Sequence, residues 1–348
     1  MTPSSRFLNP AEAARRLGVS AKALRLYEQR GLLVPARTAA GWRSYGPAEM
    51  ARATEIVALR ALGLSLAQVA RVLKGDAQGL APALAAHQAV LEAKARELDA
   101  TLDRVRGLRD ELARGRLPAP GELARLLQPD TRPALEFELP WPWPWGGERF
   151  ALSEIRPINH IVGPLGSGKT RLALRIAERF PGAVFLPLDR AEGDATATRL
   201  REDAALRSRV DAALAWLVED GATGSEALTA LLAGLEAEGP AAIVVDMVEQ
   251  GLDHATQEAL IAHLRRRGAE ARPLFLLTRS SAFLDLAAVG AHESILLCPA
   301  NHSPPTYVAP FEGAPGYEAV ATCLATPEVR ARTQGVIAWR PKVSDPAG

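Results

Sequence analysis

The chain has 348 residues, 48% hydrophobic and 23% charged, so it can bury ordinary cores, and its length favours two or three domains over one. Its only cysteines, Cys298 and Cys323, form no CxxC pattern and support neither a disulfide framework nor a structural zinc site. No apolar run approaches 18 residues and no charged-then-apolar signal segment opens the sequence, so we expect a cytoplasmic protein with no membrane partner.

The net charge of +1 conceals a strong asymmetry along the chain. Residues 1–75 carry 12 Lys and Arg against 4 Asp and Glu, a surplus of +8, whereas residues 76–348 carry 29 against 36, a balance of −7. The basic charge therefore belongs to the N-terminal end, and this indicates a polyanionic partner for that end.

Residues 10–31 predict two short helices joined by a tight turn. Small and apolar residues recur at helical spacing up to Leu17, Gly18 ends that helix, and Ser20 is a good N-cap for a second one. Such a pair is a helix-turn-helix, whose second helix enters the major groove of DNA. Residues 35–45 then contain glycine between short β-prone runs, a pattern that predicts a wing over the DNA backbone.

Three ordered motifs, GVSAKALRLYEQRGLLVPAR, GWRSY and ARATEIVALRALGLSLAQVARVL, resemble the winged-helix head of the MerR family of bacterial transcription regulators. The resemblance covers residues 7–75, a fifth of the chain. It departs at Leu26, where the family usually has a second aromatic residue before Tyr27. It implies double-stranded promoter DNA as a partner, with RNA polymerase at the same promoter, and a head that bends and untwists the promoter spacer.

The resemblance also implies DNA contacts from the second helix and from the wing. Arg43 and Tyr45 are two residues apart, so both face the same way if the wing is a strand. The candidate DNA-binding residues are Arg15, Lys22, Arg25, Tyr27, Arg37, Arg43 and Tyr45. Two alternatives stay open: Tyr27 packs between the helices, and Arg15 lies with Arg16 on a solvated face.

From Pro82 to about Arg114 the sequence predicts one long helix, interrupted by neither Gly nor Pro except at Gly107. An apolar seam recurs every seven residues at Leu84, Leu91, Leu98, Val105 and Leu112, with Ala95, Leu102 and Leu108 at partner positions. A seam of this period favours a coiled coil, and MerR-family members dimerise through an antiparallel pair of such helices. We expect a homodimer through residues 82–114 that presents two heads to a pseudo-palindromic site. The alternative is a long helix packed on its own protein.

Metal-sensing members of the MerR family bind metal through cysteines around this dimerisation helix. Neither cysteine of the chain lies near it in the sequence. We therefore do not expect metal sensing.

Residues 117–149 predict a linker rich in proline and tryptophan. The segment PWPWPW at residues 140–145 cannot continue a helix and favours an extended path. Its tryptophans, Trp141, Trp143 and Trp145, either pack between domains or include one that stacks on the base of a bound nucleotide.

A short apolar run, residues 158–162, leads into the octapeptide GPLGSGKT, and a helical pattern follows. The glycines of such a phosphate-binding loop let backbone N–H groups wrap phosphates at a helix N-terminus. Lys169 is expected to reach the β- and γ-phosphates, and the Thr170 hydroxyl to coordinate Mg²⁺. We predict ATP or a related nucleotide as cofactor, with Mg²⁺, held by Gly163, Pro164, Leu165, Gly166, Ser167, Gly168, Lys169 and Thr170.

Four further apolar runs, at residues 183–188, 241–247, 272–280 and 293–299, predict parallel strands of an α/β layer. Asp246 closes the most apolar of them and is the candidate second group near Mg²⁺, because a carboxylate at the end of a buried strand is hard to explain otherwise. We therefore predict a multidomain chain: a helix-rich winged head at 1–76, a coiled-coil dimerisation helix at 77–116, a linker at 117–149, and an α/β P-loop nucleotide-binding domain with a mainly parallel sheet at 150–348.

The stretch AIVVDMVEQGLDHATQEAL resembles the corresponding region of ABC-type ATPases, where an Asp-Glu pair precedes a GLD turn. Residues 251–253 match that turn, and residues 222–226 lie where a weakened signature loop falls. The resemblance covers residues 150–300, but Met247 stands where the family has its general base, and Thr278-Arg279 replaces a histidine. Loss of a general base typically costs about 10²- to 10⁴-fold in rate. We expect slow hydrolysis or none.

Two charged residues near this site keep alternatives open. Glu249 is a weak candidate for the missing base, unless its side chain points elsewhere. Arg279 either reads the γ-phosphate or lies solvated in a loop.

Together these features predict a DNA-binding transcription regulator whose promoter binding or distortion is controlled by the bound nucleotide. The alternative is an active ATPase or small-molecule phosphotransferase with an autoregulatory DNA-binding head; Asp189, Glu192 and Asp194 are its candidate acceptor-site residues. A third interpretation is a structural nucleotide clamp that never turns over.

Overall fold

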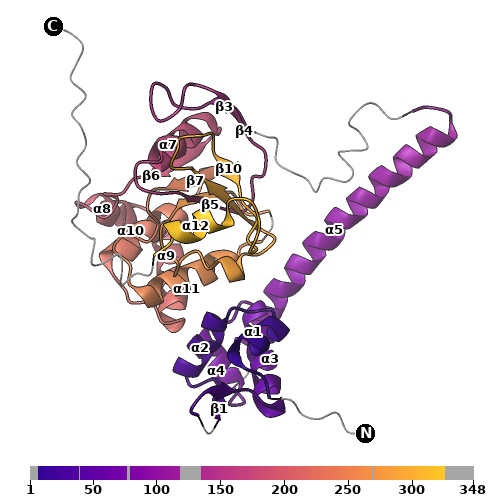
Figure 1. Ribbon diagram of the computed structural model, residues 1–348, viewed down its shortest axis with the longest axis vertical. Helices are drawn as coiled ribbons and strands as arrows, with labels where there is room; N and C mark the ends of the chain where they lie inside the picture. The colour runs from indigo at the N-terminus through magenta and orange to yellow at the C-terminus, as the bar shows by residue number, and fades with distance from the viewer. Residues whose placement is uncertain (1–6, 39, 77–78, 118–134, 269, 326–348) are drawn as a thin grey trace.

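The computed structural model describes residues 7–38, 40–76, 79–117, 135–268 and 270–325. The described chain has three parts: a helical head, a long helix that extends away from it, and an α/β unit (Figure 1). Within these ranges, no helix is both long and apolar enough to span a membrane.

Side-chain caps begin the helices of the head. Asn9 and Glu12 form a capping box on the first helix, and Ser20 Oγ accepts the N–H of Ala23 at the start of the second. Gly18 closes the first helix at φ 67°, a left-handed conformation that glycine adopts without strain. The head consists of α1 (Pro10–Leu17), α2 (Ala21–Gln29), the antiparallel wing strands β1 (Ala36–Arg37) and β2 (Arg43–Ser44), α3 (Pro47–Ala61) and α4 (Leu66–Val72). The predicted winged helix-turn-helix is confirmed.

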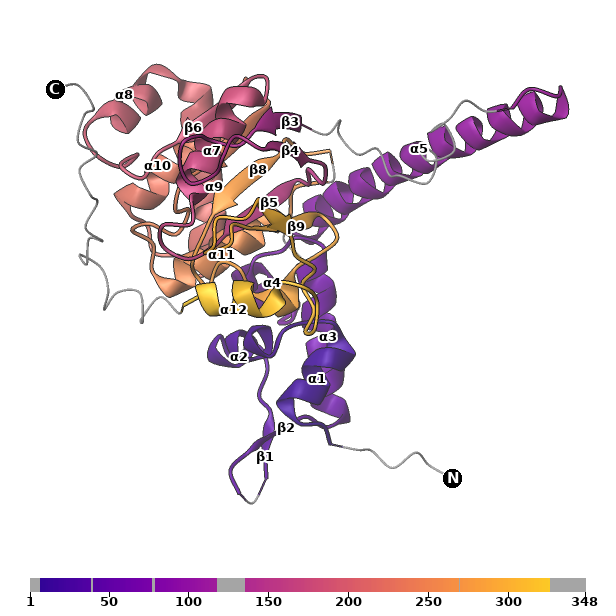
Figure 2. The same cartoon turned by 45° about the horizontal axis from the view of Figure 1, so that its top comes forward.

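The predicted long helix is present as α5 (Leu80–Ala113). It points away from the α/β unit in both views (Figures 1 and 2), and all five residues of its heptad seam are exposed, Leu98 by 65%. Of the partner positions, Leu102 is exposed and Leu108 is buried. The seam is therefore not packed on the α/β unit, and a coiled coil with a second copy stays a prediction.

The α/β unit is built on a six-stranded sheet in the order β10-β9-β5-β8-β7-β6. All neighbouring strands are parallel except β10, which runs antiparallel to β9. The strands are β5 (Ile158–Val162), β6 (Ala183–Leu186), β7 (Ala242–Val245), β8 (Leu274–Leu277), β9 (Glu293–Leu297) and β10 (Thr306–Tyr307). Every residue of β5, β7 and β8 is buried, as expected of continuous apolar runs covered on both faces. The predicted, mainly parallel sheet is confirmed.

Helices cover both faces of this sheet (Figure 2). One face packs against α7 (Lys169–Arg179) and the hairpin of β3 (Leu135–Glu138) and β4 (Arg149–Leu152). The other face packs against α9 (Ala204–Glu219), α10 (Glu226–Leu235) and α11 (His254–Arg265). The remaining helices are α8 (Ala195–Glu202), the 3-10 turn η1 (Leu286–Ala288) and α12 (Tyr317–Cys323).

The predicted linker needs a correction in its second half. Residues 135–149 belong to the α/β unit, because Phe137, Leu139 and Trp145 are buried in the same cluster as α7. Residues 141–145 form turns and not the expected extended path, since prolines fit turns as well as extended chain. Residues 118–134 of that linker lie outside the described residues.

Candidate functional site

The phosphate-binding loop runs from the end of β5 to the start of α7, the context that the motif requires. Two of its glycines have no room for a side chain. A Cβ on Gly163 would lie 2.4 Å from the carbonyl oxygen of Cys298, and one on Gly168, at φ 91°, would lie 2.2 Å from Cγ of Pro144. The loop is therefore closely packed between β9 and the Pro-Trp segment.

Lys169 is buried at the first position of α7. Its ammonium donates to the carbonyl oxygens of Gly163 and Pro164 at 2.8 and 2.7 Å, so it lies inside the loop that would wrap a phosphate. Burial lowers the pKa of Lys169, and the nearby charge of Arg279 lowers it further. A bound phosphate would favour the charged ammonium.

Thr170 and Asp246, the two predicted Mg²⁺ ligands, are brought together. The Thr170 hydroxyl donates to Oδ2 of Asp246 at 3.1 Å, although 76 residues separate them in the chain. Burial raises the pKa of Asp246, while the Thr170 hydrogen bond and the charges of Lys169 and Arg190 oppose that rise. Two adjacent oxygen ligands beside a phosphate loop fit a Mg²⁺ that keeps several waters.

Arg190 is a residue of this site that sequence reasoning missed. Its guanidinium donates to the carbonyl oxygens of Asp246 and Met247 at 2.8 and 3.0 Å. It thereby fixes the turn after β7, in which Met247 has a φ of 44°, unusual for a residue other than glycine. The only sequence signal was an arginine shortly after a predicted strand.

Glu249 and Arg279 also lie at this edge of the sheet. Oε1 of Glu249 accepts the backbone N–H of Arg279 at 2.9 Å, and the charge of Glu249 acts on both Asp246 and Arg190. Glu249 thus points back toward the site. The Arg279 Nε is buried and has no hydrogen-bond partner among the described residues. The candidate acceptor residues Asp189, Glu192 and Asp194 are all exposed in the connection between β6 and α8.

The three tryptophans have different surroundings. Trp145 is buried and its indole N–H donates to the carbonyl of Ser303 at 3.1 Å, so this residue packs within the α/β unit and not between domains. Trp143 is 45% exposed and lies beside the loop, with the Arg171 guanidinium 5.7 Å from its ring and the His302 ring at 5.6 Å. Trp141 is mostly exposed. Trp143 is therefore the candidate for stacking on a base.

The two short motifs shared with ABC-type ATPases lie at helix starts. Oγ of Ser225, within the signature-like residues 222–226, accepts the N–H of Leu228 and caps α10. Asp253, the last residue of the GLD turn, accepts the N–H of Thr256 and caps α11. Both side chains have a structural role in this conformation.

Four of the predicted DNA-binding arginines and lysines lie at the surface of the head. Arg15, Arg25 and Arg37 are exposed on α1, α2 and the wing. Lys22 on α2 instead forms an ion pair of 2.8 Å with Glu258 of α11.

The other three candidates, Tyr27, Tyr45 and Arg43, make contacts within the head. Tyr27 and Tyr45 are buried in the core of the head. Arg43 and Tyr45 do face the same way, but toward α2, where both donate to the Glu28 carboxylate at 2.7 Å. Burial and this hydrogen bond raise the pKa of Tyr45. These contacts tie the wing to α2, so the three residues support the head in this conformation.

Residues 8–76 match the family model of the MerR HTH family regulatory proteins. The head is a MerR-type helix-turn-helix domain. Over 67 residues the chain is 42% identical to the "Probable heavy metal-dependent transcriptional regulator" of Haemophilus influenzae. The aligned region covers 19% of this chain and 52% of that protein. It is also 42% identical over 67 residues to the HTH-type transcriptional regulator HmrR of Sinorhizobium medicae, and that alignment covers 19% of this chain and 46% of HmrR. The chain thus spans about half the length of these curated relatives.

Two solved structures are similar in part. One is a MerR family regulator lacking the sensor domain, bound to promoter DNA, with 22% identity over 32% of this chain and 92% of that one, at a TM-score of 0.25. The other is the ADP conformation of an ATP-binding cassette of an ABC transporter, with 15% identity and a TM-score of 0.36. That match covers 59% of this chain and 100% of the cassette.

We predict that Trp143→Ala weakens binding of Mg²⁺-ATP by about 1–3 kcal/mol, the range typical of aromatic stacking on a base. Isothermal titration calorimetry on the full chain measures the change. Trp141→Ala, from the same segment, is the matched control and should bind as tightly as wild type. Equal affinities of wild type and Trp143→Ala would contradict the stacking role.

Proposed function

We propose that the chain is a DNA-binding transcription regulator whose MerR-type head engages promoter DNA in response to ATP, or a related nucleotide, bound with Mg²⁺ in the α/β unit. The observation that carries this proposal is the position of α11. One side of this helix is bonded to the segment that follows β8 at the nucleotide site, and another side holds Lys22 of the head.

Nucleotide binding is supported by the convergence of four side chains at the carboxyl ends of β5, β7 and β8. Lys169 lies in the loop, Thr170 contacts Asp246, and Arg279 adds a cation whose Nε has no partner among the described residues. Ammonium, guanidinium and loop N–H groups suit the phosphates, and the Thr-Asp pair suits Mg²⁺.

DNA binding is supported by the charge and the fold of the head. The first 75 residues carry a surplus of +8, and exposed arginines lie on α2 and on the wing. Such a surface binds phosphates, while the second helix of a helix-turn-helix fits the major groove. We propose promoter DNA as the target and RNA polymerase as a further partner there.

The link between the two sites runs through a short series of hydrogen bonds. Ser280, next to Arg279, donates to Oε1 of Gln257 in α11, and Nε2 of Gln257 donates to the carbonyl of Leu252. The neighbouring residue, Glu258, holds Lys22. A nucleotide that moves the segment after β8 would thereby shift α11 under the head. Thermodynamic linkage requires DNA to change nucleotide affinity by the same factor.

We predict that the dissociation constant for duplex DNA changes about 5- to 150-fold between nucleotide-free protein and protein saturated with Mg²⁺-ATP, the usual range of an allosteric coupling. Fluorescence anisotropy with a duplex selected from a random pool measures it without nucleotide and with ADP, ATP or a non-hydrolysable ATP analogue. Lys169→Ala should abolish the change, because the variant lacks the phosphate-binding ammonium.

Arg175→Ala is the control for that experiment, because it removes a cation from further along the same helix, where Arg175 pairs with the exposed Glu178. It should respond to ATP as wild type does. A dissociation constant that is identical in all nucleotide states would contradict nucleotide control and leave DNA binding intact.

The alternative function, an active ATPase, is favoured by the position of Glu249. Its carboxylate accepts the Arg279 N–H after β8 and lies close enough to Asp246 for its charge to raise the pKa of that residue. If Glu249 serves as the general base, Glu249→Gln should lower phosphate release about 10²- to 10⁴-fold. Steady-state phosphate release with saturating ATP measures this, and Glu178→Gln is the control. An unchanged rate in a variant that still binds nucleotide would exclude Glu249 as the base.

We also propose that the protein is a homodimer through the α5 seam at residues 82–114. Leu98→Lys should shift the protein to monomer in sedimentation or light-scattering measurements, because it puts a charge into the apolar seam. Asp103→Asn changes the net charge by the same amount outside the seam, where Asp103 pairs with the exposed Arg106, and should stay dimeric. An unchanged mass for Leu98→Lys would contradict this interface.

A further inference from the structure

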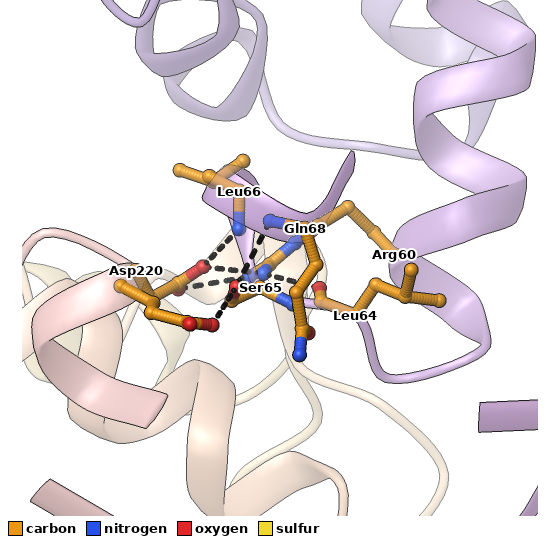
Figure 3. A network of polar contacts seen from close by, with 7 residues as sticks. Arg60, Leu64, Ser65, Leu66, Gln68 and Asp220 are labelled. Carbon is orange, nitrogen blue, oxygen red and sulfur yellow. Dashed lines mark hydrogen bonds and ion pairs between the residues drawn. The ribbon is translucent and has the colours of Figure 1, made fainter. Parts of the chain in front are cut away.

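The head and the α/β unit meet at a buried carboxylate. Asp220, the C-cap residue of α9, is 4% exposed, and its oxygens accept three hydrogen bonds from the head (Figure 3). Two come from the Arg60 guanidinium at 2.6 and 3.1 Å, and the third comes from the Leu66 N–H at 2.7 Å. A forked, charge-assisted contact of this kind fixes both distance and orientation between its partners.

Contacts around Asp220 extend the same interface. Ser65 Oγ donates to Glu219 at 3.0 Å, and Arg71 lies 3.6 Å from the other oxygen of that carboxylate. The Arg60 guanidinium also lies over the Trp216 ring of α9, 5.8 Å from its centroid. Residues of α3, α4 and α9 therefore form one continuous polar contact.

A second contact lies where α2 faces α11. Lys22 pairs with Glu258 at 2.8 Å, and the same Glu258 oxygen contacts His254. A cleft of about 170 Å³ separates the helices beside this pair, and Ala23, Leu26 and Tyr27 of α2 line it. The face of α2 that carries Lys22 is thus turned toward the α/β unit.

The charges on the two sides of the interface are complementary. The head supplies Lys22, Arg60 and Arg71, and the α/β unit supplies Glu219, Asp220 and Glu258. The head carries the basic surplus of the chain and the remainder carries the acidic one. The α/β unit therefore meets the head with carboxylates, and one of them pairs with Lys22, a candidate DNA-binding residue.

We propose that this docked arrangement is an autoinhibited state, in which α9 holds α3 and α4 of the head, and α11 holds Lys22 of the recognition helix α2 in competition with DNA. The inference rests on the proposed DNA binding by the head. Lys22 cannot pair with Glu258 and contact DNA at once. While α11 lies opposite the Lys22 face of α2, across a narrow cleft, that face cannot enter a major groove. DNA binding then requires release of Arg60 and Leu66 from Asp220.

The test uses the full chain with substitutions that lie only in the α/β unit, so that the DNA-contacting residues stay intact. Asp220→Asn weakens the Arg60 contact, and Glu258→Gln weakens the Lys22 contact. Each also removes one negative charge, which by itself favours DNA binding. Glu136→Gln is the matched control, because it removes the same charge from the β3–β4 hairpin at the opposite end of the α/β unit (Figure 1).

Both interface variants should bind a selected duplex about 5- to 150-fold more tightly than wild type in fluorescence anisotropy at fixed salt, without nucleotide. Glu136→Gln should match wild type within twofold or so. In the same free proteins, hydrogen exchange at Leu66 and along α2 should be faster in Asp220→Asn than in wild type, because docking protects these amides.

Affinities for the duplex that are equal in wild type and in both variants, or weaker in the variants, would overturn autoinhibition while leaving DNA binding by the head intact. Tighter binding by Glu136→Gln to the same extent would also overturn it, since charge alone would then explain the effect. Absence of duplex binding in wild type and in every variant would overturn the proposed function, and the autoinhibited state with it.

Discussion

The parallel order of β5, β8 and β7 is the constraint on which the candidate site depends. Strands that run in the same direction end at the same edge of the sheet, so the segments that follow them meet there. Lys169 follows β5, Asp246 follows β7 and Arg279 follows β8, and only this strand order brings three residues so distant in sequence together. The turn held by Arg190 and the hydrogen bond from Arg279 N–H to Glu249 then fix the acidic side of the site.

The same edge of the sheet leads to the head because α11 begins close to it. Asp253 caps α11 only a few residues after Asp246, and Gln257 bonds the first turns of the helix to Ser280. At its other end, Arg265 pairs with Glu293 at the start of β9, and His160 bonds to the same carboxylate. Burial raises the pKa of Glu293, but the contacts with His160 and Arg265 outweigh it and lower the pKa to about 2. The helix is thus tied to the sheet at both ends, which is the connection that the proposed nucleotide control requires.

Local patterns in the sequence predicted what local physics determines. Continuous apolar runs gave the strands, Ser20 and Gly18 gave the helix ends, and the GKT loop gave Lys169 and Thr170, because propensity, capping and phosphate wrapping act within a few residues. Asp246 was also predictable, since a carboxylate at the end of a buried strand is costly unless a cation or a metal ion compensates its charge.

Longer-range contacts escaped the same reasoning. Alternation along the wing correctly put Arg43 and Tyr45 on one side, but it could not tell that both side chains bond to Glu28 of α2. Asp220 lies 160 residues from Arg60, in a helix end with no motif, so nothing in its neighbourhood marked it. Such contacts are decided by how whole units pack.

The energetics of a buried ion pair suit a contact that has to open. Removing Arg60 and Asp220 from water costs several kcal/mol per ion, and their attraction with the Leu66 hydrogen bond returns a similar amount. The net free energy of docking through this pair is therefore small, although losing one partner of a closed pair costs about 3–5 kcal/mol. When the head leaves, water solvates both groups and neither charge stays buried. The pair thus specifies one docked orientation while adding little to its net stability, as the proposed release of the head requires.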